Sequence, residues 1–319
     1  MGKNLSTWLV GLAGVVGACY WTILSPRSQI MGWFPYRGNR SGQMIALTFD
    51  DGPNEPFTTQ IGEFLASKAI RATFFQVGRC VERFPEATER LMQQGHVIGN
   101  HSYSHETMKC LAPRLQRQEA QATQQILQRV IGHTPALYRP PWLLRTPALQ
   151  ATLRSHGLQP VSGEFCHPLE VFQPSPLRIA RRALAKARPG AILIFHDGFN
   201  SHQADRANTV EAVKTVVARL IRQGYLFVTV DELLDIPAYQ DPAPAGRAVQ
   251  AHLNRTRRRG GNGVDRPHLI AEQSGQRDAV PGRTAIAGHV DTPPTGDPRR
   301  HPPRLHTSHA WWGDRREDQ

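Results

Sequence analysis

Residues 45–53 have the sequence IALTFDDGP, in which an apolar run ends in two adjacent carboxylates, Asp50 and Asp51, and then in a Gly-Pro turn. A buried strand that ends in this way projects its carboxylates into the loop at its C-terminal end, where parallel-sheet proteins place their sites. Two like charges so close together repel each other unless a cation or an arginine compensates them. We therefore expect a partner for this acidic pair elsewhere in the chain.

Short apolar runs alternate with amphipathic segments between residues 43 and 237. This alternation predicts repeated βα units around a parallel sheet or barrel. We expect an α/β catalytic domain over residues 40–237, folded as a distorted (β/α) barrel of seven parallel strands that is closed or nearly closed. The expected strands are residues 43–49, 72–77, 96–99, 136–139, 159–162, 191–195 and 225–230.

Helical periodicity marks three of the intervening segments, in which apolar residues recur every three or four positions. The expected buried faces are formed by Phe57, Ile61, Phe64 and Leu65, by Leu115, Ala122, Ile126 and Val130, and by Val210, Val213, Val217, Leu220 and Ile221. Gly224 follows the third face and predicts the end of that helix.

Polar residues follow four of the expected strands, and strand ends of a parallel barrel converge on one mouth. Each group alone would be an ordinary set of loop residues, but four groups at one rim indicate a site. The two histidines of the second group are four residues apart, so they can face one way on a helical turn, as metal ligands must. The groups are Asp50-Asp51, His101-Ser102-Tyr103-Ser104-His105, Arg139-Pro140-Pro141-Trp142 and His196-Asp197-Gly198.

The motifs TFDDGP (48–53), HSYSH (101–105), RPPW (139–142) and ILIFH (192–196) resemble the ordered motifs of the polysaccharide deacetylases, carbohydrate esterase family four. The resemblance covers about residues 40–237, in the family's order and spacing. It implies a distorted barrel of βα units that removes N-acetyl groups from chitin-like or peptidoglycan sugars. It also implies one divalent metal ion, commonly zinc.

By this resemblance, Asp51, His101 and His105 would form an Asp-His-His set of metal ligands. Three protein ligands leave positions open for water and substrate, as in a catalytic zinc site. We expect Zn²⁺, with Co²⁺ or another divalent ion as the alternative. Such an ion would polarise the acetamide carbonyl and lower the pKa of its bound water.

The resemblance assigns the remaining chemistry to five residues. Asp50 would take a proton from the attacking water, and His196 would protonate the departing amine. Arg139 would pair with Asp50 and orient it. The backbone N–H of Trp142 would donate to the oxyanion, and the Trp142 indole and the Leu193 side chain would form the walls of a pocket for the acetyl methyl.

The chain departs from the family's motifs in two places. Leu143 stands where the third motif usually has a glycine, so this loop cannot use a conformation reserved for glycine. The acidic fourth motif is missing, and the corresponding region is SGEFCHPLEVF at residues 162–172. Glu164 or Glu170 could replace the acid that tunes His196, and His167 could add a contact. The sequence leaves this choice open.

Residues 1–30 contain a positive start, with Lys3 as the only charge before an apolar run from residue 8 to residue 24. The run is of about the length that a bilayer requires, roughly 17 to 25 residues. We interpret it as an uncleaved membrane anchor that leaves the catalytic domain extracytoplasmic. The alternatives are a cleaved signal peptide, a lipoprotein signal at Val16-Gly17-Ala18-Cys19 and an ordinary buried helix.

Residues 238–319 lack hydrophobic periodicity and are rich in Pro, Gly, Arg and His, which predicts a disordered basic tail. The net charge of +12 favours anionic partners such as lipid headgroups or acidic envelope polymers. An extracytoplasmic enzyme does not meet DNA, so we expect no nucleic-acid partner.

The four cysteines, at positions 19, 80, 110 and 166, form neither a zinc motif nor a dense disulfide framework. In an exported domain, a bridge between Cys80 and Cys110 is conceivable.

The leading hypothesis is a membrane-anchored, metal-dependent N-deacetylase that acts on an aminosugar polymer. Two alternatives stay open at this point. The chain could be a catalytically weakened carbohydrate-binding protein, because the fourth motif is altered, or a metal hydrolase that cleaves another amide or an ester.

Overall fold

The computed structural model describes residues 2–39 and 42–240, with side chains from Trp8 onward. The predicted tail, residues 238–319, lies outside the described residues from residue 241 onward, but its start is part of the domain, since Ala238 and Tyr239 are buried. The strands are β1 (Met44–Asp50), β2 (Thr73–Gln76), β3 (Val97–Asn100), β4 (Leu137–Tyr138), β5 (Gln159–Pro160), β6 (Glu164–Phe165), β7 (Ile192–His196) and β8 (Leu226–Phe227). The longer helices are α1 (Gly2–Ile23), α2 (Phe57–Ser67), α4 (Pro85–Gln93), α6 (Pro113–Ile131), α7 (Pro147–Ser155), α8 (Pro176–Lys186) and α9 (Ala207–Arg222). The short helical segments are α3 (Gly78–Arg83), α5 (Thr107–Leu111), α10 (Val230–Leu234), η1 (Pro141–Leu143) and η2 (Glu170–Phe172).

Seven strands form one sheet in the order β5-β4-β3-β2-β1-β7-β6, and β8 pairs with the start of β1. All these pairs are parallel, so the strand ends that carry the polar motifs lie at one edge. In the central pairing, Asp50 of β1 lies opposite His196 of β7 and Phe75 of β2. Each of the seven predicted strands overlaps an observed one. The sequence analysis missed β6, a strand of two residues.

The sheet is an open, curled half-barrel with β5 and β6 as its edges, so the prediction of a closed or nearly closed barrel is wrong. Both edge strands have only two residues. Pro160 in β5 has no N–H to donate to a further strand, which confines β5 to an edge. The backbone N–H of Ser162, between the two edges, instead donates to the carbonyl oxygen of Pro35 at 2.8 Å.

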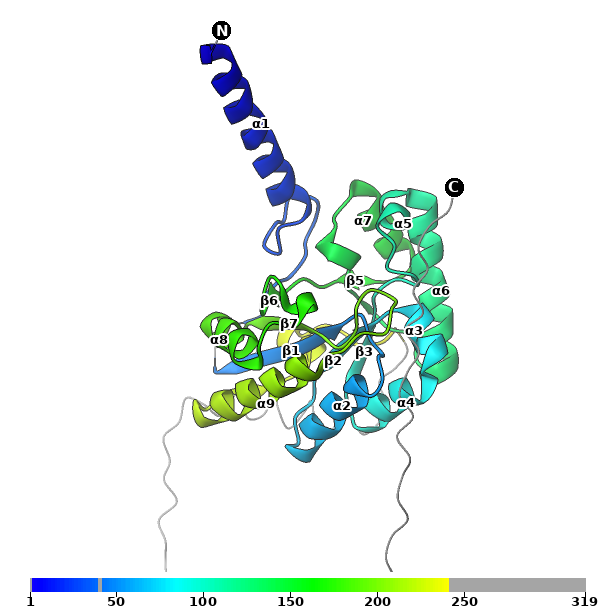
Figure 1. Ribbon diagram of the computed structural model, residues 1–319. Coiled ribbons are helices and arrows are strands. Elements are labelled where there is room, and N and C mark those ends of the chain that lie inside the picture. The colour runs from blue at the N-terminus through cyan, green and yellow to red at the C-terminus, as the bar shows by residue number, and fades with distance from the viewer. Residues whose placement is uncertain (1, 40–41, 241–319) are drawn as a thin grey trace, which may run out of the picture. The chain divides into compact units, whose positions relative to one another are not determined.

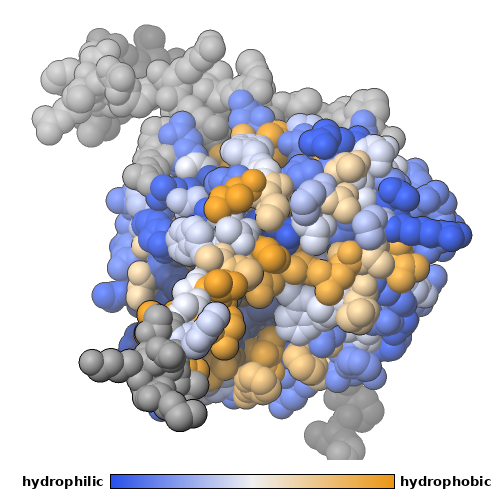
Figure 2. All heavy atoms as spheres, turned by 90° about the horizontal axis from the view of Figure 1, so that it is seen from above, coloured by the Kyte–Doolittle hydropathy of each residue, from blue (hydrophilic) through white to orange (hydrophobic). Residues whose placement is uncertain are grey.

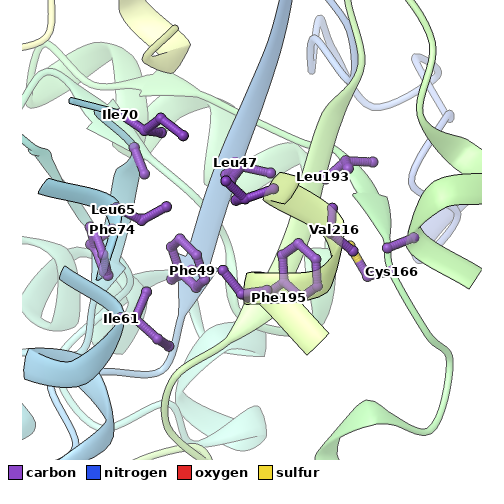
Figure 3. Packing of buried hydrophobic residues seen from close by; sticks show 14 of the residues in the cluster. Leu47, Phe49, Ile61, Leu65, Ile70, Phe74, Cys166, Leu193, Phe195 and Val216 are labelled. Atoms are coloured by element: carbon purple, nitrogen blue, oxygen red, sulfur yellow. The ribbon is translucent and has the colours of Figure 1, made fainter. Parts of the chain in front are cut away.

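Helices cover the outer face of the sheet in the succession α8, α9, α2, α4, α6 and α7, and each packs against the next (Figure 1). The main core lies between β1, β2 and β7 and this layer (Figure 3). There the Phe49 ring stacks on Phe74 at 4.8 Å and on Phe195 at 5.8 Å between ring centroids. This packing fixes the central strands whose C-terminal ends carry the candidate site.

The predicted faces of α2 and α9 are largely confirmed, although Ile221 at the end of α9 is exposed. The predicted face of α6 is wrong in part, because Leu115 is exposed. Polar side chains occupy four of the seven buried positions of α6, namely Gln116, Glu119, Thr123 and Gln124. Gln116, Glu119 and Gln124 bond to backbone groups outside the helix, whereas the Thr123 hydroxyl donates to the Glu119 carbonyl oxygen within it. Apolar periodicity cannot reveal a helix face whose buried residues are mostly polar.

The N-terminal apolar segment forms α1, whose side chains are exposed from Trp8 to Trp21. Within the described part of the chain, no helix combines the length and the apolar character needed to cross a membrane. The membrane anchor therefore stays a prediction. The conceivable bridge between Cys80 and Cys110 is not formed, since all four cysteines are free.

Candidate active site

The C-terminal ends of β1, β3 and β7 and the loops that follow them enclose a cavity of about 270 Å³. Its polar lining includes the Asp50-Asp51 pair, His101, His105 and His196. The structure thus brings together side chains that lie up to 146 positions apart in the sequence. The predicted convergence of strand ends on one mouth is observed.

Asp51, His101 and His105 are buried, and their ligand atoms lie within 4.8 Å of one another. Nε2 of His101 lies 3.3 Å and Nε2 of His105 lies 3.2 Å from Oδ1 of Asp51. Nδ1 of His101 lies 2.7 Å from the carbonyl oxygen of Arg139, which accepts its proton. With Nδ1 engaged in this hydrogen bond, His101 turns Nε2 toward the carboxylate.

The protonation of this group fits a divalent cation. Burial lowers the pKa of His105 to about 4, although Asp51 opposes the effect, so His105 is neutral at neutral pH. Burial alone would raise the pKa of Asp51, but the neighbouring histidines hold it below its ordinary value. An ionised carboxylate, the neutral His105 imidazole and Nε2 of His101 thus lie around one point, an arrangement that suits a divalent cation.

The histidine motif forms a loop, so the predicted helical turn is wrong. Ser102 and His105 both have left-handed backbone conformations, with φ of 65° and 59°. Buried side chains fix this path. Oδ1 of Asn100 accepts the Ser102 N–H at 2.9 Å, and Oε2 of Glu119 on α6 accepts the N–H groups of Tyr103 and Ser104. The two imidazoles meet through the loop conformation and not through helical spacing.

Asp50 is held by Arg139, whose Nη1 lies 2.6 Å from Oδ1 of the carboxylate. The guanidinium also donates to Oγ1 of Thr48 at 2.7 Å and to the carbonyl oxygen of Ser162 at 3.0 Å. Its carbon lies 4.1 Å from the centroid of the Phe75 ring. Arg139 is fully buried, so its orientation, and with it that of the Asp50 carboxylate, is fixed. It is the arginine that the acidic pair was expected to require.

Glu170 is the acid that contacts His196. Its Oε2 lies 2.8 Å from Nδ1 of His196, and its Oε1 accepts the His196 N–H and the Thr209 hydroxyl. Burial opposes protonation of the imidazole, but Glu170 and the two aspartates outweigh it and raise the pKa of His196 to about 9. His196 is thus an imidazolium at neutral pH. It can supply a proton.

The other two candidates of the altered fourth motif have different contacts. Glu164 pairs with Arg188 and, at 3.4 Å, with Arg27. His167 accepts the N–H of Leu169 through Nδ1 at 3.0 Å. The choice that the sequence left open therefore falls on Glu170.

Comparison with known proteins identifies the family of this chain. The family described as polysaccharide deacetylase matches residues 37–161. A peptidoglycan-N-acetylglucosamine deacetylase of Bacillus cereus is 31% identical over 204 residues, which are 64% of this chain and 93% of that protein. The chain belongs to the polysaccharide deacetylase family.

Two solved structures of the family are also similar. A family 4 acetyl xylan esterase from Clostridium thermocellum, in complex with a cobalt ion, has a TM-score of 0.55 and 30% identity, over 61% of this chain and 94% of that one. A family 4 pseudoenzyme from Bacillus anthracis has a TM-score of 0.58 and 25% identity, over 66% of this chain and 70% of that one. The family thus includes an esterase that binds a cobalt ion and a protein described as a pseudoenzyme.

The predicted pocket walls of this deacetylase-family chain have different places. The Trp142 ring lines the cavity and packs edge-on against His105 at 5.1 Å between centroids. Leu193 is fully buried in the core on the helix side of the sheet, near Val216, and does not line the cavity (Figure 3). Side chains alternate along a strand, so Leu193 and His196 point to opposite sides of β7. Leu193 is therefore not part of the site, and its predicted role as a pocket wall is wrong.

Sequence reasoning missed the apolar residues that complete the cavity. The Phe165 ring is nearly parallel to the His196 ring at 6.0 Å between centroids, and Tyr20, Val171 and Phe199 also line the cavity. The N–H of Asn200 donates to Oδ2 of Asp51 at 2.9 Å. The sequence offered one signal for Phe199 and Asn200, since they directly follow the His196-Asp197-Gly198 motif.

Proposed function

We propose that this protein is a metal-dependent hydrolase that removes N-acetyl groups from an aminosugar polymer such as peptidoglycan or a chitin-like glycan. One observation carries the proposal. The lined cavity holds an acid paired with a buried arginine, Asp50, and an imidazolium paired with a buried carboxylate, His196, beside the Asp51-His101-His105 set.

A divalent ion held by Asp51, His101 and His105 would polarise the acyl carbonyl and acidify a water molecule. The triad suits Zn²⁺ or Co²⁺, since it offers two imidazoles and one carboxylate. The neutral His105 imidazole requires no deprotonation before it binds the ion. Two backbone groups of the chain stabilise this arrangement: the Arg139 carbonyl oxygen accepts from His101, and the Asn200 N–H donates to Asp51.

In the proposed reaction, Asp50 accepts the proton of the attacking water. The Arg139 guanidinium keeps the carboxylate oriented toward the cavity. The Trp142 N–H donates to the oxyanion of the tetrahedral species. His196 then gives its Nε2 proton to the departing amine, while Glu170 on Nδ1 stabilises the imidazolium until that transfer.

The proposed location is the outer side of a membrane, with α1 as the attachment. The exposed apolar side chains of α1 support this, since a helix that is apolar on all sides needs an apolar partner. Apolar side chains also gather in patches on the upper side of the molecule among hydrophilic ones (Figure 2). We propose that the basic C-terminal residues add attraction to an anionic surface.

Acetate release by the purified full-length chain tests the function, with peptidoglycan and chitooligosaccharides as substrates. Release that stops with a chelator and returns with zinc is the expected result. Asp50→Asn should abolish release, a loss of about 10²- to 10⁴-fold or more, while the metal stays bound. Release that survives this change would remove Asp50 as the base.

Two other functions are outcomes of the same assay. No release from either substrate by the zinc-loaded protein would favour a binding role, as the existence of a pseudoenzyme in the family allows. Acetate release from acetylated xylan but not from aminosugars would favour ester hydrolysis, as the acetyl xylan esterase allows.

A further inference from the structure

Residues 25–36 precede the segment matched by the family, yet they pack into the domain. Ser25, Ser28 and Phe34 are buried. The Gln29 side chain bonds both backbone groups of Phe34 at 2.8 Å and so closes this segment into a compact loop. The loop lies at the open side of the half-barrel, where the carbonyl oxygen of Pro35 accepts the Ser162 N–H.

Arg145 joins this N-terminal loop to the active-site rim. Its Nη1 donates to the carbonyl oxygens of Ser25 at 2.7 Å and Leu143 at 3.0 Å. Its Nη2 donates to the carbonyl oxygen of Pro26 at 3.2 Å and to Oγ of Ser162 at 3.0 Å. The side chain is 1% exposed, and burial lowers the pKa of the guanidinium to about 10, so it stays charged at neutral pH.

The rim segment that Arg145 holds has an unfavourable backbone. Trp142 and Leu143 follow each other with φ of 58° and 53°, in the left-handed region that side chains other than glycine avoid. Leu143 stands where the family usually has glycine, yet it adopts the left-handed conformation, so the prediction that this loop cannot do so is wrong. Such a backbone persists only where the surroundings determine it. The bond to the Leu143 carbonyl oxygen supplies that constraint.

We propose that Arg145 is a positioning residue for the reaction, and that residues 25–36 are part of the catalytic unit through it. By fixing Leu143, Arg145 sets the direction of the Trp142 N–H, the group that the proposed function assigns to the oxyanion. Ser162 extends the connection, because its Oγ accepts from Arg145 and its carbonyl oxygen accepts from Arg139, which orients Asp50. The inference rests on the proposed function for its kinetic consequence only.

Kinetics and hydrogen exchange on the full-length, zinc-loaded protein test this inference with three variants, Ser162→Ala, Arg145→Lys and Arg145→Gln. Ser162→Ala removes one hydrogen bond of the Arg145 guanidinium, Arg145→Lys removes some of them, and Arg145→Gln removes the charged donor. Because the oxyanion contact forms in the transition state, kcat should fall in this order, by about 10- to 100-fold for Arg145→Gln, while KM and zinc affinity stay near their original values. Arg71→Gln is the control. Arg71 pairs with Glu232 and lies just before β2, at the N-terminal ends of the strands, whereas the site lies at their C-terminal ends.

Hydrogen exchange gives the readout that does not depend on activity. Amides of residues 141–145 and 25–36 should exchange faster in Arg145→Gln, and those of β1 should not. Equal exchange in Arg145→Gln and the control, or parallel losses of kcat, KM and zinc affinity, would overturn the positioning role. If the original protein releases no acetate, the proposed function fails, and the exchange result still decides whether Arg145 holds the rim.

Discussion

Glu170 should determine the pH range over which the proposed hydrolase works. The pKa of His196 is about 9 instead of the ordinary 6.5, which corresponds to about 3 kcal/mol in favour of the imidazolium. Glu170 contributes both the contact at 2.8 Å and the largest favourable charge. A bound cation would offset the charges of Asp50 and Asp51, so the contribution of Glu170 is the one that persists in the loaded enzyme.

The change Glu170→Gln keeps the shape of the side chain and removes the charge. An opposite charge at this distance raises the pKa of a cationic group by about 1 to 3 units, so the pKa of His196 should fall to about 7. At pH 8 the protonated fraction would then drop from about nine-tenths to about one-tenth, which predicts an activity loss of about 10-fold. At pH 6 both proteins hold the proton, so the loss should be small.

The assay is the dependence of kcat on pH between 5.5 and 9.5 for both proteins. Glu164→Gln is the matched control, because Glu164 is an equally buried acid of the same region that pairs with Arg27 and Arg188 instead of His196. The alkaline limb should move to lower pH in Glu170→Gln and stay in place in Glu164→Gln. A loss of the same size at every pH would refute the reasoning, since His196 would not then be the acid that Glu170 tunes.

Three other changes test the site, the core and the chain outside the described residues. Glu119→Gln should weaken zinc binding by about 10- to 100-fold in a metal titration, because the Glu119 carboxylate holds the loop between the two histidine ligands, and zinc affinity equal to the original would refute this. Leu193→Ala should lower the free energy of unfolding by about 2 to 5 kcal/mol in a denaturant titration and leave KM unchanged, whereas a raised KM would return Leu193 to the substrate pocket. Deletion of residues 241–319 should weaken binding to anionic vesicles at low salt without changing turnover of a soluble substrate, and equal vesicle binding would exclude the tail as the anionic contact.

The sequence predicted the strands well because most of them are short apolar runs bounded by turn residues, and all seven predicted segments overlap strands of the sheet. It predicted the polar side chains of the cavity because strand ends in a parallel sheet meet by geometry alone. It failed for Leu193, because the resemblance placed this residue in the pocket although alternation along β7 puts it on the side opposite to His196. It also failed for the path of residues 101–105, which depends on Glu119 of a distant helix. Glu170 was found among several candidates, since two-residue elements such as β6 and three-residue elements such as η2 leave no periodicity to read.

The loops of this site share a construction that explains why local patterns could not predict it. Asp51, His105 and Leu143 all have left-handed backbones, which side chains other than glycine adopt at a cost. Each is held by a polar partner. The Asn200 N–H for the Asp51 carboxylate and Glu119 for the residues before His105 come from elsewhere in the chain, whereas Arg145, which holds the Leu143 carbonyl oxygen, lies two residues further on. Buried hydrogen bonds therefore hold these loops in unfavourable backbone conformations, and those conformations orient the reactive groups. It follows that conservative changes at these partners should reduce activity more than they reduce stability, because the loops can relax while the core around Phe49 stays packed.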